Sequence, residues 1–68
     1  MESLKNRLKD LRAARNLTQA DLAVMALVSR KTINTIENGV FVPSTVLALK
    51  LARVLNARVE DLFYLEEQ

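Results

Sequence analysis

Apolar residues recur at helical spacing along most of the chain, separated by residues that start or stop helices. The first predicted helix has an apolar face at intervals of four and three residues: Leu4, Leu8 and Leu11. Asn16 is expected to end it, because Asn tolerates the left-handed conformation. Thr18, with Asp21 three residues later, is typical of the N-cap and capping box of a second helix. The inner face of that helix consists of small and aliphatic residues: Leu22, Ala23 and Ala26.

A third helix is predicted after Ser29, which is a favoured N-cap residue. A rotation of about 100° per residue places Ile33 and Ile36 on one side of this helix. Polar side chains lie on the other side: Arg30, Lys31, Asn34, Thr35 and Asn38. Gly39 follows, at the position where helices commonly end with a residue of positive φ. The third helix is therefore amphipathic, with a strongly polar outer face.

The fourth predicted helix is the most apolar. Ser44 caps it after Pro43, and it runs to about Leu55. Its core stripe has helical spacing: Leu47, Ala48, Leu51, Ala52 and Leu55. Further apolar residues lie outside that stripe: Val46, Leu49 and Val54. Residues 59 to about 65 form a last short helix or an extended tail, so we predict an all-α, compact five-helix domain.

The composition excludes most catalytic chemistry. The 68 residues contain no Cys and no His, which removes disulfides, zinc sites with those ligands, thiolate nucleophiles and imidazole bases. The adjacent carboxylates Glu60 with Asp61 and Glu66 with Glu67 lie in an acidic tail, without a nucleophile beside a base. We therefore expect no enzymatic activity, no cofactor and no metal.

Charge is distributed unevenly along the chain. Residues 1–31 carry seven basic and three acidic side chains, a net charge of +4, whereas residues 32–68 carry three basic and five acidic, a net charge of −2. The basic part could face a polyanion, although solvated helix faces produce such patterns as well. No apolar run approaches the roughly 18 residues of a membrane span, and no signal-peptide pattern opens the chain. We expect a cytoplasmic protein with no membrane partner.

Residues 17–39 read LTQADLAVMALVSRKTINTIENG. This stretch resembles the helix-turn-helix of the phage repressor and Cro family, also called the xenobiotic response element family. The similarity continues through Pro43 and Ser44, the segment VLALKLARVL and the ending VEDLF. It implies a single lambda-repressor-like domain over residues 1–68, with its helix-turn-helix at about residues 18–38, that binds specific sequences of double-stranded DNA.

The resemblance also implies roles for individual residues. Donors on the outer face of the third helix would read base edges: Arg30, Lys31, Asn34 and Thr35. Four residues would hold the phosphate backbone: Gln19, Ser29, Asn38 and Arg15. Arg12 and Glu37 match a structural ion pair of the family. Glu37 also lies on the inward side of its helix, where a partly buried carboxylate needs a partner.

Leu27 departs from the family pattern, which usually has Gly in the turn between the two helices. A left-handed conformation costs a residue other than Gly about 1–2 kcal/mol. Either the turn is strained or it is rebuilt. Ala26 is smaller than the large aliphatic residue that the family usually has there, so Leu27 could tip inward to fill the gap.

Two functions of different classes stay open. A transcriptional regulator, most simply a repressor, would occupy an operator as a homodimer, because one recognition helix reads only a few base pairs. Surplus apolar residues late in the chain are the candidates for the dimer interface: Val46, Leu49, Tyr64 and Leu65. The alternative is an antitoxin or another protein-interaction module of the same fold. Its partner surface would use outward-facing apolar residues: Val24, Met25, Val40, Phe41 and Val42.

Overall fold

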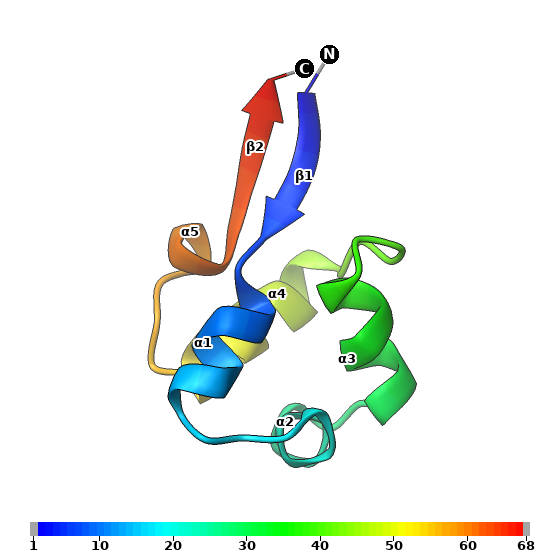
Figure 1. Cartoon of the computed structure of the whole chain (residues 1–68), viewed down its shortest axis with the longest axis vertical. Helices are drawn as coiled ribbons and strands as arrows, with labels where there is room; N and C mark the ends of the chain where they lie inside the picture. The colour runs from blue at the N-terminus through cyan, green and yellow to red at the C-terminus, as the bar shows by residue number, and fades with distance from the viewer. Residues whose placement is uncertain (1, 68) are drawn as a thin grey trace.

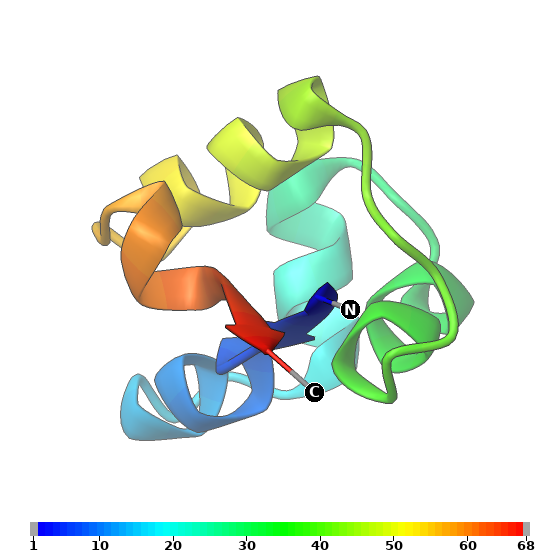
Figure 2. The same cartoon turned by 90° about the horizontal axis from the view of Figure 1, so that it is seen from above.

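The computed structural model describes residues 2–67, and over that range it contains five helices and a two-stranded antiparallel sheet (Figure 1). The elements follow in the order β1 (Glu2–Asn6), α1 (Leu8–Ala14), α2 (Gln19–Ala26), α3 (Arg30–Glu37), α4 (Thr45–Val54), α5 (Val59–Leu62) and β2 (Phe63–Glu67). The paired strands extend away from the helices (Figure 1). Figure 2 looks down on the same molecule from above and shows the helices arranged around the base of the strands.

The helices α2 and α3 form the predicted helix-turn-helix, and both begin with the predicted caps. Thr18 Oγ1 accepts a hydrogen bond from the Asp21 N–H at 3.0 Å, and Asp21 Oδ2 accepts one from the Thr18 N–H at 2.9 Å. Ser29 Oγ caps α3 by accepting from the Thr32 N–H at 3.1 Å. These side chains satisfy backbone donors that the first turn of a helix otherwise leaves unpaired.

The turn between α2 and α3 keeps the left-handed conformation at Leu27, with φ 60° and ψ 43°. The Leu27 side chain is 80% exposed, so the prediction that it tips inward is wrong. Ala26 is fully buried without its help. The turn therefore places a leucine where the backbone favours glycine. The other predicted helix ends, Asn16 and Gly39, also have positive φ, and so does Asn56 after α4.

The prediction of an all-α domain is wrong, because the two ends of the described chain pair as β-strands. Leu4 was expected on the first helix, but it lies in β1 opposite Leu65 of β2, and α1 begins only at Leu8. The four-residue interval between Leu4 and Leu8 fits one face of a helix. It fits one face of a strand equally well, because side chains on the same face of a strand recur every two residues. The pairing with residues 63–67 decides the outcome, since it supplies the backbone partners that a strand needs. At the other end the chain adopts both of the predicted forms, the short helix α5 and then an extended strand.

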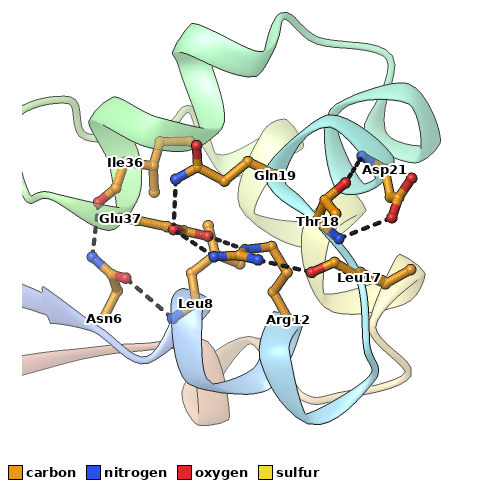
Figure 3. Close-up of polar contacts among 9 residues, drawn as sticks. All are labelled: Asn6, Leu8, Arg12, Leu17, Thr18, Gln19, Asp21, Ile36 and Glu37. Carbon is orange, nitrogen blue, oxygen red and sulfur yellow. Dashed lines mark hydrogen bonds and ion pairs between the residues drawn. The ribbon is translucent and has the colours of Figure 1, made fainter.

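Asn6 joins the strands to the helices at the end of β1. Its Nδ2 donates to the carbonyl of Ile36 at 2.9 Å, and its Oδ1 accepts from the Leu8 N–H at 3.1 Å (Figure 3). The neighbouring Arg7 N–H donates to the carbonyl of Leu62 at 2.8 Å. The base of the sheet is thus fastened to α1, α3 and α5, although the sheet contributes no fully buried residue to the core.

All five helices contribute to one hydrophobic core. The apolar faces predicted for the second and third helices are the faces that point inward. Within the described residues, no helix has both the length and the apolar character needed to span a bilayer. The core is formed by small and aliphatic side chains: Leu8, Leu22, Ala23, Ala26, Ile33, Ile36, Leu51, Ala52, Leu55 and Leu62.

Candidate nucleic-acid interface

The outer face of α3 carries exposed donors on a rigid base. Ile33 and Ile36 are fully buried and hold the inner face of the helix against the core. Arg30, Lys31 and Asn34 lie on the opposite face and are exposed. Because the inner face is fixed by packing, these side chains leave the helix from a well-defined backbone. The separation of the two faces is as predicted.

Two of the predicted base-reading residues already have partners within the protein. Thr35 is half-buried, and its Oγ1 lies 3.0 Å from the backbone carbonyls of both Lys31 and Thr32. Its hydroxyl proton is therefore used inside the helix, and its methyl group is the part left for a contact. Asn34 Oδ1 accepts from Asn38 Nδ2 at 3.2 Å, so the Asn34 amide N–H groups remain for another acceptor.

The structure brings the start of α2 beside the outer face of α3. Gln19, the first residue of α2, lines a shallow hollow together with Arg30, Lys31 and Asn34. The first backbone N–H groups of α2 belong to the same end of that helix, which favours negative charge. A predicted phosphate ligand and three predicted base readers thus converge on one surface, which we name the α2–α3 hollow.

A second hollow lies on the other side of α3, next to the loop that follows it. It is lined by Ser29, Lys31, Thr32 and Thr35 of the helix and its cap, and by Val40 and Phe41 of the loop. Thr32 was missed in the sequence reasoning. Its spacing of three residues from Thr35 was the signal that could have placed it on this side of the helix.

A buried ionic network adjoins the α2–α3 hollow through Gln19, which belongs to both. Figure 3 shows the contacts of this network. Arg12 donates from Nε to Glu37 Oε2 at 2.7 Å and from Nη2 to Glu37 Oε1 at 3.3 Å, and its Nη1 donates to the Leu17 carbonyl at 2.7 Å. Gln19 Nε2 donates to Glu37 Oε1 at 3.0 Å. The side chains of Glu37 and Arg12 are only 2% and 13% exposed. The network therefore joins α1, the following loop, α2 and α3.

Hydrogen bonds in this region shift the pKa values of two groups, Arg12 and Asp21. Donation to Glu37 raises the pKa of the Arg12 guanidinium above its ordinary value, helped by the charge of Glu37 and opposed by desolvation. The backbone N–H of Thr18 lowers the pKa of the Asp21 carboxyl, and the Thr18 side chain adds to that effect. Both groups are charged at neutral pH, so the ion pair and the cap of α2 are in place together.

The remaining predicted phosphate ligands lie at helix ends. Ser29 is the N-cap of α3, and its Oγ is also 2.9 Å from Thr32 Oγ1. Asn38 is the C-cap of α3 and is exposed. Arg15 is exposed at the C-terminal end of α1 and lines neither of the two hollows.

The predicted dimer residues divide between two surfaces of the molecule, with Val46 and Leu49 on α4 and Tyr64 and Leu65 on β2. Val46, Leu49 and Leu65 are 69%, 54% and 61% exposed. Leu65 pairs with Leu4, which lines an apolar groove between the sheet and α4. The other residues of this groove come from the start of α4, from α5 and from β2: Pro43, Thr45, Ala48, Leu49, Val59 and Phe63. Leu4, missed in the sequence reasoning because it was assigned to a helix, thus joins the apolar face.

Tyr64 belongs to a different surface. It alternates with Leu65 along β2, so its side chain points to the opposite face of the sheet. The Arg7 guanidinium carbon lies 4.1 Å from the centre of the Tyr64 ring, a cation–π contact. Tyr64 also lines a polar hollow with Lys5, Asn38 and Gly39.

Comparison with known proteins identifies the framework that carries this interface. The profile of a family described as helix-turn-helix matches residues 8–62. The chain belongs to this helix-turn-helix family. The matched segment runs from the first residue of α1 to the last residue of α5, so β1 and β2 lie outside it. The lambda-repressor-like part of the fold prediction is confirmed.

The chain is similar to uncharacterised helix-turn-helix transcriptional regulators of archaea and bacteria. It is 45% identical over 65 residues to one from Archaeoglobus fulgidus, covering 96% of this chain and 92% of the relative. It is 48% identical over 64 residues to one from Methanocaldococcus jannaschii, covering 94% and 97%. These relatives are regulators and not enzymes, in agreement with the expectation from composition.

Two solved structures share the fold. The restriction-modification controller protein C.AhdI from Aeromonas hydrophila superposes with a TM-score of 0.77 at 34% identity, covering 81% of this chain and 83% of that one. A putative DNA-binding protein from Bacteroides fragilis superposes with a TM-score of 0.82 at 28% identity, covering 90% and 98%. These two structures and the two archaeal regulators are thus each matched over most of their own length.

Proposed function

We propose that the protein is a cytoplasmic, sequence-specific regulator of transcription that represses by occupying an operator in double-stranded DNA. The observation that carries the proposal is the α2–α3 hollow, where Gln19 at a helix N-terminus meets Arg30, Lys31 and Asn34 on the recognition helix. A polyanion is favoured at such a helix end, and long donors beside it reach base edges. Membership in a helix-turn-helix family supports the same use of this surface.

Each side chain of the outer face suits a particular partner. Arg30 and Lys31 are long donors that suit the acceptors of guanine, and the free amide N–H groups of Asn34 suit adenine N7. The Thr35 methyl suits the methyl group of thymine, since its hydroxyl proton is used within the helix. The phosphate backbone is assigned to residues at helix ends: Gln19, Ser29, Asn38 and Arg15.

The experiment that tests base reading compares two kinds of DNA. Lys31→Ala or Asn34→Ala should weaken binding to the preferred duplex by about 1–3 kcal/mol and weaken binding to random duplex much less. Lys9→Ala is the matched control, because it removes the same charge from an exposed position on α1. It should leave the ratio of the two affinities unchanged. Equal losses on both duplexes would reassign the substituted residue to the phosphate backbone.

We assign dimer formation to the apolar face that α4 and the sheet share. Leu4 and Leu49 line its groove, and both are exposed. Leu65 pairs with Leu4 across the sheet, and Val46 lies about one helical turn before Leu49 on α4. A small domain buries more apolar surface when it associates, and a two-fold dimer binds half-sites about 34 Å apart on one side of the duplex.

Leu49→Glu should convert a micromolar dimer into a monomer in sedimentation and weaken operator binding. Ala13→Glu, which adds the same charge at an exposed position on α1, is the control. A monomeric parent whose Leu49→Glu variant binds operator equally well would refute this assignment.

A second candidate function has its own observation. Five apolar side chains outside the dimer face are between 47% and 77% exposed: Val24, Met25, Val40, Phe41 and Val42. They favour a protein partner, as in an antitoxin or another interaction module. A salt titration separates the two candidates, because phosphate contacts release counterions and make DNA affinity fall steeply with salt. Absent or salt-independent binding to duplex DNA would favour the protein-interaction module.

A further inference from the structure

Glu37 lies where α1, α2 and α3 meet, and it accepts hydrogen bonds from two different residues. Its side chain is 2% exposed. Arg12 supplies two donors, at 2.7 Å to Oε2 and at 3.3 Å to Oε1, and this fork pairs the buried charge. Gln19 Nε2 supplies a third donor, at 3.0 Å to Oε1. The third contact therefore comes from the α2 residue that faces the proposed DNA surface.

The contact with Glu37 fixes which end of the Gln19 amide faces outward. A carboxylate accepts from an N–H and repels a carbonyl oxygen, so the amide cannot turn over without losing this hydrogen bond. Figure 3 shows the Gln19 oxygen directed away from Glu37. Since one N–H is used by Glu37, the second N–H and the oxygen remain for other partners, and Gln19 lines the α2–α3 hollow.

We propose that Glu37 is a positioning residue, which holds the Gln19 amide so that its second N–H meets a phosphate of the DNA. This inference rests on the proposed DNA binding. Gln is among the side chains that lose most rotamer freedom when they are immobilised. Here that loss occurs on folding and not on binding, so the contact with phosphate costs less when it forms. Glu37 is buried and acts on DNA only through Gln19.

A double-mutant cycle on DNA affinity tests the proposal. Gln19→Ala should weaken binding to the preferred duplex by roughly fivefold, the value of one hydrogen bond. Glu37→Met keeps the bulk of the side chain but removes every acceptor, and it should cause a similar loss. The double variant should bind within about twofold of Gln19→Ala, because Glu37 acts on DNA only through the Gln19 side chain and has no further effect once that side chain is removed. Multiplied losses, or a Glu37→Met affinity equal to that of the parent, would overturn the proposal.

Arg12→Lys is the matched control, because it separates the effect of a weakened ion pair on stability from the effect of a lost Glu37–Gln19 contact on DNA binding. It breaks the two-pronged contact with Glu37 while leaving the contact between Glu37 and Gln19 intact. All variants are compared at a temperature where circular dichroism shows them folded. Should Glu37→Met fail to fold, Glu37→Asp replaces it, because the carboxylate then retreats from Gln19 by one methylene and keeps its charge.

A duplex in which one phosphate carries no charge gives a further test. The affinity lost on removing that charge would be the same for Glu37→Met as for the parent if Glu37 had a purely structural role. Methylphosphonate is substituted, one position at a time, into the preferred duplex. At the phosphate that Gln19 contacts, the parent and Arg12→Lys should lose affinity, whereas Gln19→Ala and Glu37→Met should lose none. Equal sensitivity of all four proteins at every phosphate would refute the positioning role. A parent that binds no duplex would overturn the proposed function as well, whereas additive losses in a protein that binds DNA would overturn this inference alone.

Discussion

Removing Arg12 should destabilise this domain more than removing Glu37. In Arg12→Met, the carboxylate of Glu37 stays only 2% exposed and keeps a single donor from Gln19. A buried charge that loses its partner costs about 3–5 kcal/mol. In Glu37→Met, the Arg12 side chain is already 13% exposed and reaches water with a small movement, so we expect a loss of about 1–3 kcal/mol.

These losses are large for a chain of 68 residues. Domains of this length have free energies of unfolding of about 3–10 kcal/mol, and each kcal/mol lowers the melting temperature by about 4–8 °C. Arg12→Met should therefore melt at least about 12 °C below the parent. The double variant replaces the pair with two apolar side chains, so it should lose much less than the sum of the single losses.

The assay is urea unfolding of the four proteins at low temperature, followed by circular dichroism. A coupling free energy of about 2 kcal/mol or more is expected from the burial and the two-pronged geometry. A value below about 1 kcal/mol, typical of exposed pairs, would refute the reasoning that this network is a buried structural element.

Three further predictions concern the turn, the strand junction and the cap of α2. Leu27→Gly should raise the free energy of unfolding by about 1 kcal/mol, because Leu27 is left-handed and exposed. The control Ala20→Gly, inside α2, should lower it by about as much. A lower free energy of unfolding in both variants would show that the turn carries no strain. Asn6→Ala should cost about 1–3 kcal/mol in thermal unfolding through two lost hydrogen bonds, and an unchanged melting temperature would contradict its role as the junction. Thr18 lowers the pKa of Asp21 in the folded protein, whereas the pKa of Asp21 in the unfolded chain is the ordinary one. The contribution of Asp21 to stability is therefore complete at a pH above the unfolded pKa, and it disappears as the pH falls through the folded pKa. An NMR titration in which Asp21 protonates at its ordinary pH would disprove this.

The helix-turn-helix could be predicted because its signals are local. Thr18 and Ser29 lie next to the helices they cap, and the inward positions of Ile33 and Ile36 follow from helical spacing alone. The left-handed conformation at Leu27 could also be predicted as one of two alternatives, since the turn is short and its geometry leaves few conformations.

The strands could not be predicted, because their partners are far apart in the sequence. Leu4 pairs with Leu65, and nothing within a few residues of either one marks that pairing. The same non-local contact decides that Tyr64 turns away from the apolar face to meet Arg7. Gln19 was predicted only as a phosphate ligand, since its bond to Glu37 depends on the angle at which α2 and α3 meet.

The most direct measurement of the central claim is selection of binding sites from random duplex DNA with the purified protein. We predict enrichment of a two-fold symmetric site whose half-sites are about 10 base pairs apart, bound roughly a thousandfold or more tightly than random duplex. Asn34→Ala should change the enriched sequence at one position in each half-site, whereas Gln19→Ala should leave it unchanged. A pool that stays random after selection, with equal affinity for every duplex, would contradict the claim.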